Sequence, residues 1–261
     1  MAGLPRVLVL GGTTEAAELV RRLAAADRPP LDVTMSLAGR TSMLPDLPGG
    51  MRVGGFGGVD GLRRHLDDTA VDAVVDATHP FAARMPWHAE AACTAAGRPR
   101  LRLLRPAWTP EPADRWHPVA DLEAAADALR AIGARRAFLT TGRQELAPFA
   151  RMDGTWFLVR SIEAPAADEL PPGEVVLARG PFDVEDEQAL MAQHRIDAVV
   201  TKNSGAAATH AKLVAARRLG LPVVMVDRPP TPLDPLATTV AAAVAWLDDV
   251  LAGQPGWRRG V

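Results

Sequence analysis

Short apolar runs alternate along the chain with segments in which apolar residues recur at helical spacing. The runs are apolar at almost every position, which is typical of strands buried on both faces. In the first part of the chain, this pattern predicts strands at 6–10, 31–37, 51–53, 73–77 and 101–104. It predicts helices at 14–25, 58–68 and 80–96. Buried strands separated by helices indicate a parallel sheet that is covered on both sides.

The same alternation resumes after a stretch rich in proline and tryptophan at 107–119, which we interpret as a linker. Beyond it, strands are predicted at 137–140, 156–160, 175–178, 198–201 and 223–226, and helices at 121–132, 184–194, 206–219 and 238–251. The expected fold class is α/β, with two lobes of mainly parallel sheet flanked by helices. The expected lobes are residues 1–106 and 120–261. Because open α/β sheets bind ligands at the carboxyl ends of their strands, we expect a binding cleft between the lobes.

Composition narrows the choice of partners and compartment. The formal net charge is −2 and the pI is about 6.3, so no bulk positive field would draw the chain to nucleic acid or to a membrane. Cys93 is the one cysteine, which excludes an internal disulfide, and we expect it to be a buried filler rather than a reactive thiol. No metal-binding motif, targeting segment or run of ~20 apolar residues is present, so we expect a cytoplasmic protein without a metal site.

The strongest local motif is VLVLGGTTEAAEL, in which a strand leads into paired glycines and then a helix. Glycines allow close approach of a phosphate, and the helix N-terminus offers N–H groups and the positive end of a dipole. The motif departs from G-x-G-x-x-G, because Ala16 stands at the third glycine position. An ordinary capped turn is the alternative. The candidate cofactor residues here are Gly11, Gly12, Thr13, Thr14 and Glu15.

Two further strand ends in the first lobe carry polar residues. The second strand is followed by Arg40, Thr41 and Ser42, where an NAD enzyme would carry an acidic residue. An arginine there suits the 2′-phosphate of NADP, although a solvated surface arginine is the alternative. The fourth strand is followed by Thr78 and His79, which we expect near the same cofactor or, alternatively, as helix caps.

The second lobe offers two strand ends with small residues, hydroxyl groups and one cation each, a combination that suits an anion. Only two of the 29 basic Lys and Arg residues are lysines, and one of them, Lys202, lies at such a strand end. Ordinary turns and caps are again the alternative. The candidate substrate residues are Thr141, Gly142, Arg143, Lys202, Asn203, Ser204 and Gly205.

The motifs GGTTEA, AGRTS, DATHPFA, TTGRQEL and TKNSGAAATHAKLVAARRLGLPVVMVDRP, in this order over nearly the whole chain, resemble the precorrin-6A reductase family. The resemblance implies two Rossmann-like lobes and hydride transfer from NADPH to a double bond of an anionic tetrapyrrole, giving precorrin-6B from precorrin-6A in cobalamin (vitamin B12) biosynthesis. It implies that lobe 1–106 binds NADP through residues 11–15 and Arg40, with Thr78 and His79 nearby. It places Arg143 and 202–205 in the cleft-facing lobe 120–261, where they would bind either substrate carboxylates or cofactor phosphates. The expected partners are the anionic tetrapyrrole and neighbouring pathway enzymes that would receive the product.

Three other functions fit part of the pattern. An NADPH reductase of a small metabolite would not need two basic strand ends in the second lobe. A non-catalytic NADP sensor would bind both cofactor forms without oxidising NADPH. A tetrapyrrole-binding synthase would lack a nucleotide site, which the paired glycines and Arg40 argue against. We name no catalytic acid, because an electron-poor macrocycle can take its proton from water.

Overall fold

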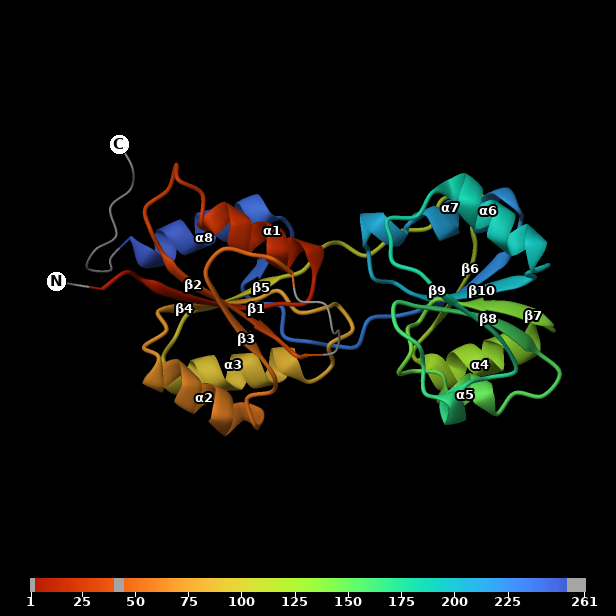
Figure 1. The fold of residues 1–261 in the computed structure, drawn as a ribbon, viewed down its shortest axis with the longest axis horizontal. Coiled ribbons are helices and arrows are strands. Elements are labelled where there is room, and N and C mark those ends of the chain that lie inside the picture. The colour runs from red at the N-terminus through yellow and green to blue at the C-terminus, as the bar shows by residue number, and fades with distance from the viewer. Residues whose placement is uncertain (1–2, 40–44, 253–261) are drawn as a thin grey trace. The chain divides into compact units, whose positions relative to one another are not determined.

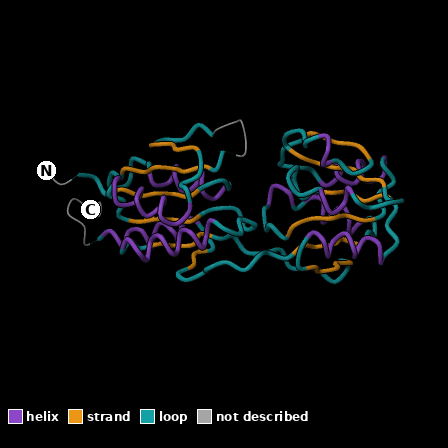
Figure 2. Tube along the Cα trace, turned by 90° about the horizontal axis from the view of Figure 1, so that it is seen from below, coloured by secondary structure: helices purple, strands orange, loops and turns teal. Residues whose placement is uncertain are grey.

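A computed structural model describes residues 3–39 and 45–252, which fall into two compact units (Figure 1). The first unit combines Met1–Pro106 with Pro229–Val261, and the second is Ala107–Arg228. Within the described residues, each unit contains one six-stranded sheet in which all paired neighbours are parallel. Figure 2 shows the strands of each unit running side by side next to their helices. The predicted α/β class with two parallel-sheet lobes is confirmed.

The first sheet has the strand order β12-β5-β4-β1-β2-β3. Its strands are β1 (Arg6–Leu10), β2 (Asp32–Leu37), β3 (Gly50–Val53), β4 (Ala73–Asp76), β5 (Arg100–Leu103) and β12 (Leu236–Ala237). Its helices are α1 (Thr14–Leu23), α2 (Gly58–Asp68), α3 (Met85–Ala96) and α8 (Val240–Leu251). Helices α1 and α8 cover one face, and α2 and α3 cover the other (Figure 1). The central strand β1 is therefore buried on both sides, as its apolar sequence requires.

The second sheet has the strand order β6-β11-β10-β7-β8-β9. Its strands are β6 (Arg115–Val119), β7 (Arg136–Leu139), β8 (Trp156–Ser161), β9 (Gly173–Leu177), β10 (Ala198–Lys202) and β11 (Pro222–Val226). Its helices are α4 (Leu122–Ala131), α5 (Ala147–Ala150), α6 (Val184–Gln193) and α7 (Ala211–Arg218), with 3₁₀ turns at Ala167–Glu169 and Ala207–Thr209. Helices α6 and α7 lie on one face, and α4 and α5 on the other (Figure 1).

The predicted lobe boundaries are wrong at the carboxyl-terminal side. The segment after Arg228 returns to the first unit, where β12 pairs with β5 and α8 packs against the same core as α1. Val240, Ala243 and Leu247 form the buried stripe of α8. Helical spacing reveals such a stripe, but it does not reveal which of two sheets the stripe covers.

The predicted linker 107–119 is also only partly correct. Its second half is β6, which pairs with β11 over Arg115–Val119 and closes one edge of the second sheet. Trp108 and Trp116 pack against the apolar core of the second unit. The prolines obscured this strand because proline usually argues against a strand. An edge strand tolerates proline, as β6 does at Pro118.

Two predicted helices begin later than their patterns indicate. The helix expected at 80–96 starts at Met85, because the Phe81 amide bonds to the His79 ring and the Ala82 amide to the His79 carbonyl oxygen, forming a turn instead. The helix expected at 206–219 divides into the turn Ala207–Thr209 and α7. Both delays leave irregular chain after a strand, at the edge where the candidate site residues lie.

Cys93 lies in α3 and is buried, as expected for a filler residue. Burial raises the pKa of the Cys93 thiol to about 12, so the reactive thiolate is scarce at neutral pH. Across the part of the chain that the structure describes, no helix is both long and apolar enough to cross a membrane.

Candidate active site

The glycine motif forms the turn between β1 and α1, at the carboxyl end of the central strand of the first sheet. Thr13 caps α1: its Oγ1 accepts the Ala16 amide proton at 3.1 Å and donates to the Ala77 carbonyl oxygen at 2.9 Å. The first N–H groups of a helix have no acceptor within the helix. The turn therefore presents backbone donors and the positive end of the α1 dipole at this edge.

Two glycines shape this turn in different ways. A Cβ at Gly11 would meet the terminal methyl group of Met35 on β2, so a larger residue there would require the Met35 side chain to shift. Gly12 has a φ of +120°, a conformation that L side chains rarely adopt, and no described heavy atom lies within 4 Å of a Cβ built there. Gly12 thus borders open space beside the helix N-terminus, as a phosphate cradle requires.

Glu15 lies in the first turn of α1 and forms an ion pair with Arg105, with 2.6 Å between Oε2 and Nη1. Arg105 follows β5, two strands away from β1 in the sheet. A carboxylate alone would repel a phosphate at this helix end, and the guanidinium offsets that repulsion. Sequence reasoning missed Arg105, whose signal is an arginine directly after a predicted strand end.

Thr78 belongs to a buried network rather than to an exposed strand end. Its Oγ1 donates to Asp76 Oδ1 at 2.7 Å and accepts from Arg102 Nη1 at 3.1 Å. The side chains of Asp76 and Arg102 are fully buried, and their ion pair measures 2.8 Å. Burial lowers the pKa of the Arg102 guanidinium, and the Asp76 carboxylate opposes that shift. The signal for Arg102 in the sequence is a charged residue within an apolar strand.

His79 follows Thr78 and is half-buried. Its Nδ1 accepts the amide proton of Phe81 at 3.2 Å, so a neutral ring carries its proton on Nε2. The imidazole is therefore oriented by its own loop. A group held in this way suits a directional hydrogen-bond donor better than a mobile proton shuttle.

Arg40, Thr41 and Ser42 lie outside the described residues, so their role at a 2′-phosphate stays a prediction. At the neighbouring strand end, Arg52 donates to the carbonyl oxygens of Gly54 and Gly55 at 2.6 and 2.7 Å. Its guanidinium also stacks on Phe56, 3.9 Å from the ring centroid. These contacts make Arg52 a brace for the loop after β3.

In the second unit, the cations predicted from the sequence lie at the carboxyl ends of β7 and β10, which are neighbours in the sheet. Arg143 pairs with Glu163, with 3.0 Å between Nη2 and Oε2, and Lys202 pairs with Glu145. Neither carboxylate was predicted: Glu145 lies within the motif TTGRQEL but was not singled out, and Glu163 lies outside every motif. Each cation thus already forms an ion pair with a carboxylate of this chain.

The turn at Thr141 and Gly142 precedes these cations. Gly142 has a φ of +99°, and Thr141 Oγ1 is buried with no hydrogen-bond partner among the described residues. An unsatisfied buried hydroxyl costs free energy unless a ligand or water completes it. The Thr141 hydroxyl could thus bond a ligand oxygen, and substrate binding by Thr141 and Gly142 stays a prediction.

Asn203 serves the fold. Its side chain bonds both backbone groups of Trp108, accepting at 2.8 Å and donating at 3.1 Å. Arg228 donates to the carbonyl oxygens of Asn203 and Ser204 at 2.8 and 3.1 Å, which fixes the path of the chain before Gly205. Direct substrate contacts by Asn203, Ser204 and Gly205 stay predictions.

The second lysine, Lys212, does not lie at the strand ends. Its ammonium group is buried, donates to the Thr209 carbonyl oxygen at 2.8 Å and lies 5.1 Å from the Trp108 ring centroid. Burial lowers the pKa of Lys212 to about 7, with the nearby Arg160 acting in the same direction. Lys212 is therefore an interior residue of the second unit.

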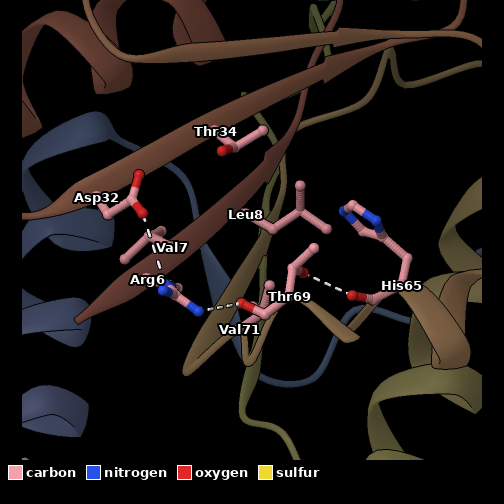
Figure 3. A pocket seen from close by; sticks show the side chains of 8 residues that line it. All are labelled: Arg6, Val7, Leu8, Asp32, Thr34, His65, Thr69 and Val71. Carbon is pink, nitrogen blue, oxygen red and sulfur yellow. Dashed lines mark hydrogen bonds and ion pairs between the residues drawn. The ribbon is translucent and has the colours of Figure 1, made fainter. Parts of the chain in front are cut away.

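A hollow of about 340 Å³ lies elsewhere in the first unit, beside Arg6–Leu8 of β1, Asp32 and Thr34 of β2 and the end of α2 (Figure 3). Arg6 is engaged there by Asp32 at 3.6 Å and by the Thr69 carbonyl oxygen at 2.9 Å. The hollow lies toward the amino ends of the strands, away from the glycine turn. In residues 3–39 and 45–252, no group of three or more His, Cys, Asp or Glu side chains is placed to hold a metal ion.

Comparison with known proteins identifies the family. Residues 6–248 match the family described as "Precorrin-6x reductase CbiJ/CobK". The chain is 50% identical over 248 residues to a precorrin-6A reductase of Rhodococcus erythropolis, covering 94% of this chain and 98% of the relative. It is 31% identical over 238 residues to a cobalt-precorrin-6A reductase of Methanothermobacter thermautotrophicus, covering 87% and 78%.

A solved structure of "CobK precorrin-6A reductase" superimposes with a TM-score of 0.87 at 42% identity, covering 95% of this chain and 97% of that one. Its fold likeness extends over both parallel sheets and therefore over both candidate strand edges. The chain belongs to the precorrin-6x reductase family of cobalamin biosynthesis.

Proposed function

We propose that this protein is an NADPH-dependent reductase that converts precorrin-6A to its dihydro product, precorrin-6B. The observation that carries the cofactor assignment is the Gly12 turn at the N-terminus of α1, with open space where a side chain would stand. Family membership supports the reductase activity. The relatives named for precorrin-6A are 42–50% identical to this chain and those named for cobalt-precorrin-6A are 30–31% identical, which favours precorrin-6A as the substrate.

The first unit fits the diphosphate of the cofactor. Backbone N–H groups at the start of α1 would bind phosphate oxygens, and the Arg105 partner of Glu15 offsets the one carboxylate in that turn. Arg40 would bind the 2′-phosphate and select NADPH over NADH. His79, with its Nδ1 engaged by Phe81, would donate from Nε2 to an acceptor oxygen of the dinucleotide.

When bound, NADPH supplies a hydride to one carbon of a macrocycle double bond, and a proton from water reaches the other carbon. The chain's contribution is to hold the two reactants in register and to supply complementary charge. Arg143 and Lys202 would bind carboxylates of the macrocycle, exchanging their present carboxylate partners for those of the substrate.

The deciding experiment mixes the purified protein with NADPH and precorrin-6A and follows nicotinamide absorbance together with the mass of the macrocycle. We expect NADPH oxidation that depends on precorrin-6A and a product heavier by two hydrogens. Binding of NADPH without oxidation would instead favour a sensor. Oxidation with a small metabolite but not the macrocycle would favour the other reductase class, and no NADPH binding would refute the proposal.

A further inference from the structure

Arg102 makes an unusual set of contacts at the end of β4. The two N–H groups of its Nη1 are shared among four acceptors on two residues: the Asp76 carbonyl oxygen and Oδ1 at 3.0 and 2.8 Å, and the Thr78 carbonyl oxygen and Oγ1 at 3.3 and 3.1 Å. One guanidinium therefore clamps the backbone on both sides of Ala77. The chain leaves β4 in a conformation that this contact defines.

Stability gives no reason for this arrangement. Within the described part of the chain, Asp76 Oδ2 and Arg102 Nε and Nη2 are buried with no hydrogen-bond partner. Burial of a charged pair is costly when its polar atoms stay unsatisfied, and an apolar pair often serves a core equally well. The pair therefore makes better sense as a device that fixes geometry.

The geometry it fixes belongs to the candidate cofactor site. Ala77, inside the clamp, accepts a hydrogen bond from Thr13 Oγ1, the cap of α1, at 2.9 Å. His79, directly beyond the clamp, has its ring oriented by the Phe81 amide. The clamp thus couples the glycine turn to the loop that carries His79.

We propose that Asp76 and Arg102 are positioning residues, which fix the Thr78–His79 segment next to Ala77, the residue bonded to the glycine turn, so that His79 can donate to the bound dinucleotide. This inference rests on the proposed function, because it assigns the dinucleotide to that turn. Neither side chain touches the ligand, since both are fully buried. They act through the Thr78–His79 segment.

The test separates positioning from folding by removing the pair in steps. Asp76→Asn or Arg102→Met alone leaves one buried charge without its partner, and we expect each to lower the melting temperature. The double variant Asp76→Asn with Arg102→Met leaves no buried charge, and we expect its melting temperature to recover relative to both single variants. Its Kd for NADPH should stay raised by roughly 10-fold or more, the loss expected for one hydrogen bond to a charged group.

A matched control exists in the second unit, where Arg160 and Glu187 form another buried ion pair. The double variant Arg160→Met with Glu187→Gln removes the same chemistry from a unit other than the one that contains the glycine turn. We expect it to alter the melting temperature and to leave the Kd for NADPH within twofold of the parent value, roughly the scatter of independent sites.

A thermodynamic cycle with His79→Ala tests the route of action. If the clamp works through His79, the substitution raises the Kd in the parent but changes it little in the double variant at Asp76 and Arg102. Additive losses, or a double variant that binds NADPH as the parent does, would overturn the positioning role. A parent protein that binds no NADPH in the same titration would overturn the proposed function and this inference with it.

Discussion

Replacing Gly12 by alanine or valine separates two contributions of the glycine turn. At a φ of +120° any L side chain strains the backbone, which costs roughly 1–3 kcal/mol of folding free energy. No described heavy atom lies within 4 Å of the added Cβ, so contact of this atom with the described residues adds nothing to that cost. We therefore expect both variants to fold, with a modestly lowered melting temperature.

The effect on cofactor binding should be much larger. A side chain at Gly12 would occupy the space in which a phosphate meets the N–H groups of α1, and charge-assisted hydrogen bonds contribute roughly 1.5–3 kcal/mol each. Loss of two such bonds raises the Kd for NADPH by ~100-fold or more. Isothermal titration calorimetry on the folded variants measures this change directly.

Gly133→Ala is the strain control for this experiment. Gly133 also has a positive φ, +69°, with no described heavy atom near its Cβ position, and it lies in the loop between α4 and β7 of the second unit. It should lose stability without losing NADPH affinity. Full NADPH affinity in a folded Gly12→Val protein would refute the phosphate-cradle reasoning, and an equal loss in Gly133→Ala would attribute the effect to strain alone.

Three further predictions concern charged residues. Lys202→Ala should raise the KM for precorrin-6A by roughly 10-fold, and Glu145→Gln should lower it, because the loss of Glu145 releases the lysine for the substrate. If steady-state kinetics show that both variants change the KM in the same direction, Lys202 does not exchange Glu145 for a substrate carboxylate. Arg40→Ala should weaken NADPH by ~10- to 100-fold and NADH much less, so equal losses in titrations would remove Arg40 from the 2′-phosphate. The pKa of Lys212 is lowered from 10.5 to about 7, so the unfolded chain binds more protons at Lys212 between these values, and this residue should make stability rise with pH, most clearly below the ordinary Cys93 pKa of 9.0, above which the raised Cys93 pKa acts in the opposite direction. Lys212→Met should abolish this rise in urea unfolding midpoints, and an unchanged rise would assign it to other groups.

Most strands and helices could be predicted from the sequence, because strands that are buried at nearly every position appear in it as continuous apolar runs. The strand at Ala73–Asp76 is buried at every position, and Thr13 and Asp121 cap their helices through side-chain oxygens, as their residue types favour. What the sequence did not reveal is strand order. The pairing of Leu236–Ala237 with β5 joins residues far apart along the chain, and no local pattern encodes that contact.

The candidate site divides in the same way. The glycine turn was predictable because a φ of +120° at Gly12 has a specific residue requirement. The partners of the predicted residues were not, because Glu15 meets Arg105, and Lys202 meets Glu145, only through the adjacency of strand ends. Arg102 combines both cases, since its charge within an apolar strand is visible in the sequence but its clamp on Thr78 is not.

The return of the chain to its first unit has a consequence for synthesis on the ribosome. The second unit is one continuous stretch, Ala107–Arg228, so all of its strands are synthesised, and leave the ribosome, before β12 and α8 do. Helix α1 packs against α8, and the apolar face they share with the first sheet stays open to water until residues 240–251 have been made. Domains usually mature in the order of their synthesis, whereas here the later unit can complete its core while the earlier one still waits. A chain released after Arg228 would therefore contain every strand of the second unit but lack β12 and α8 of the first, whose apolar face would be exposed to chaperones and proteases.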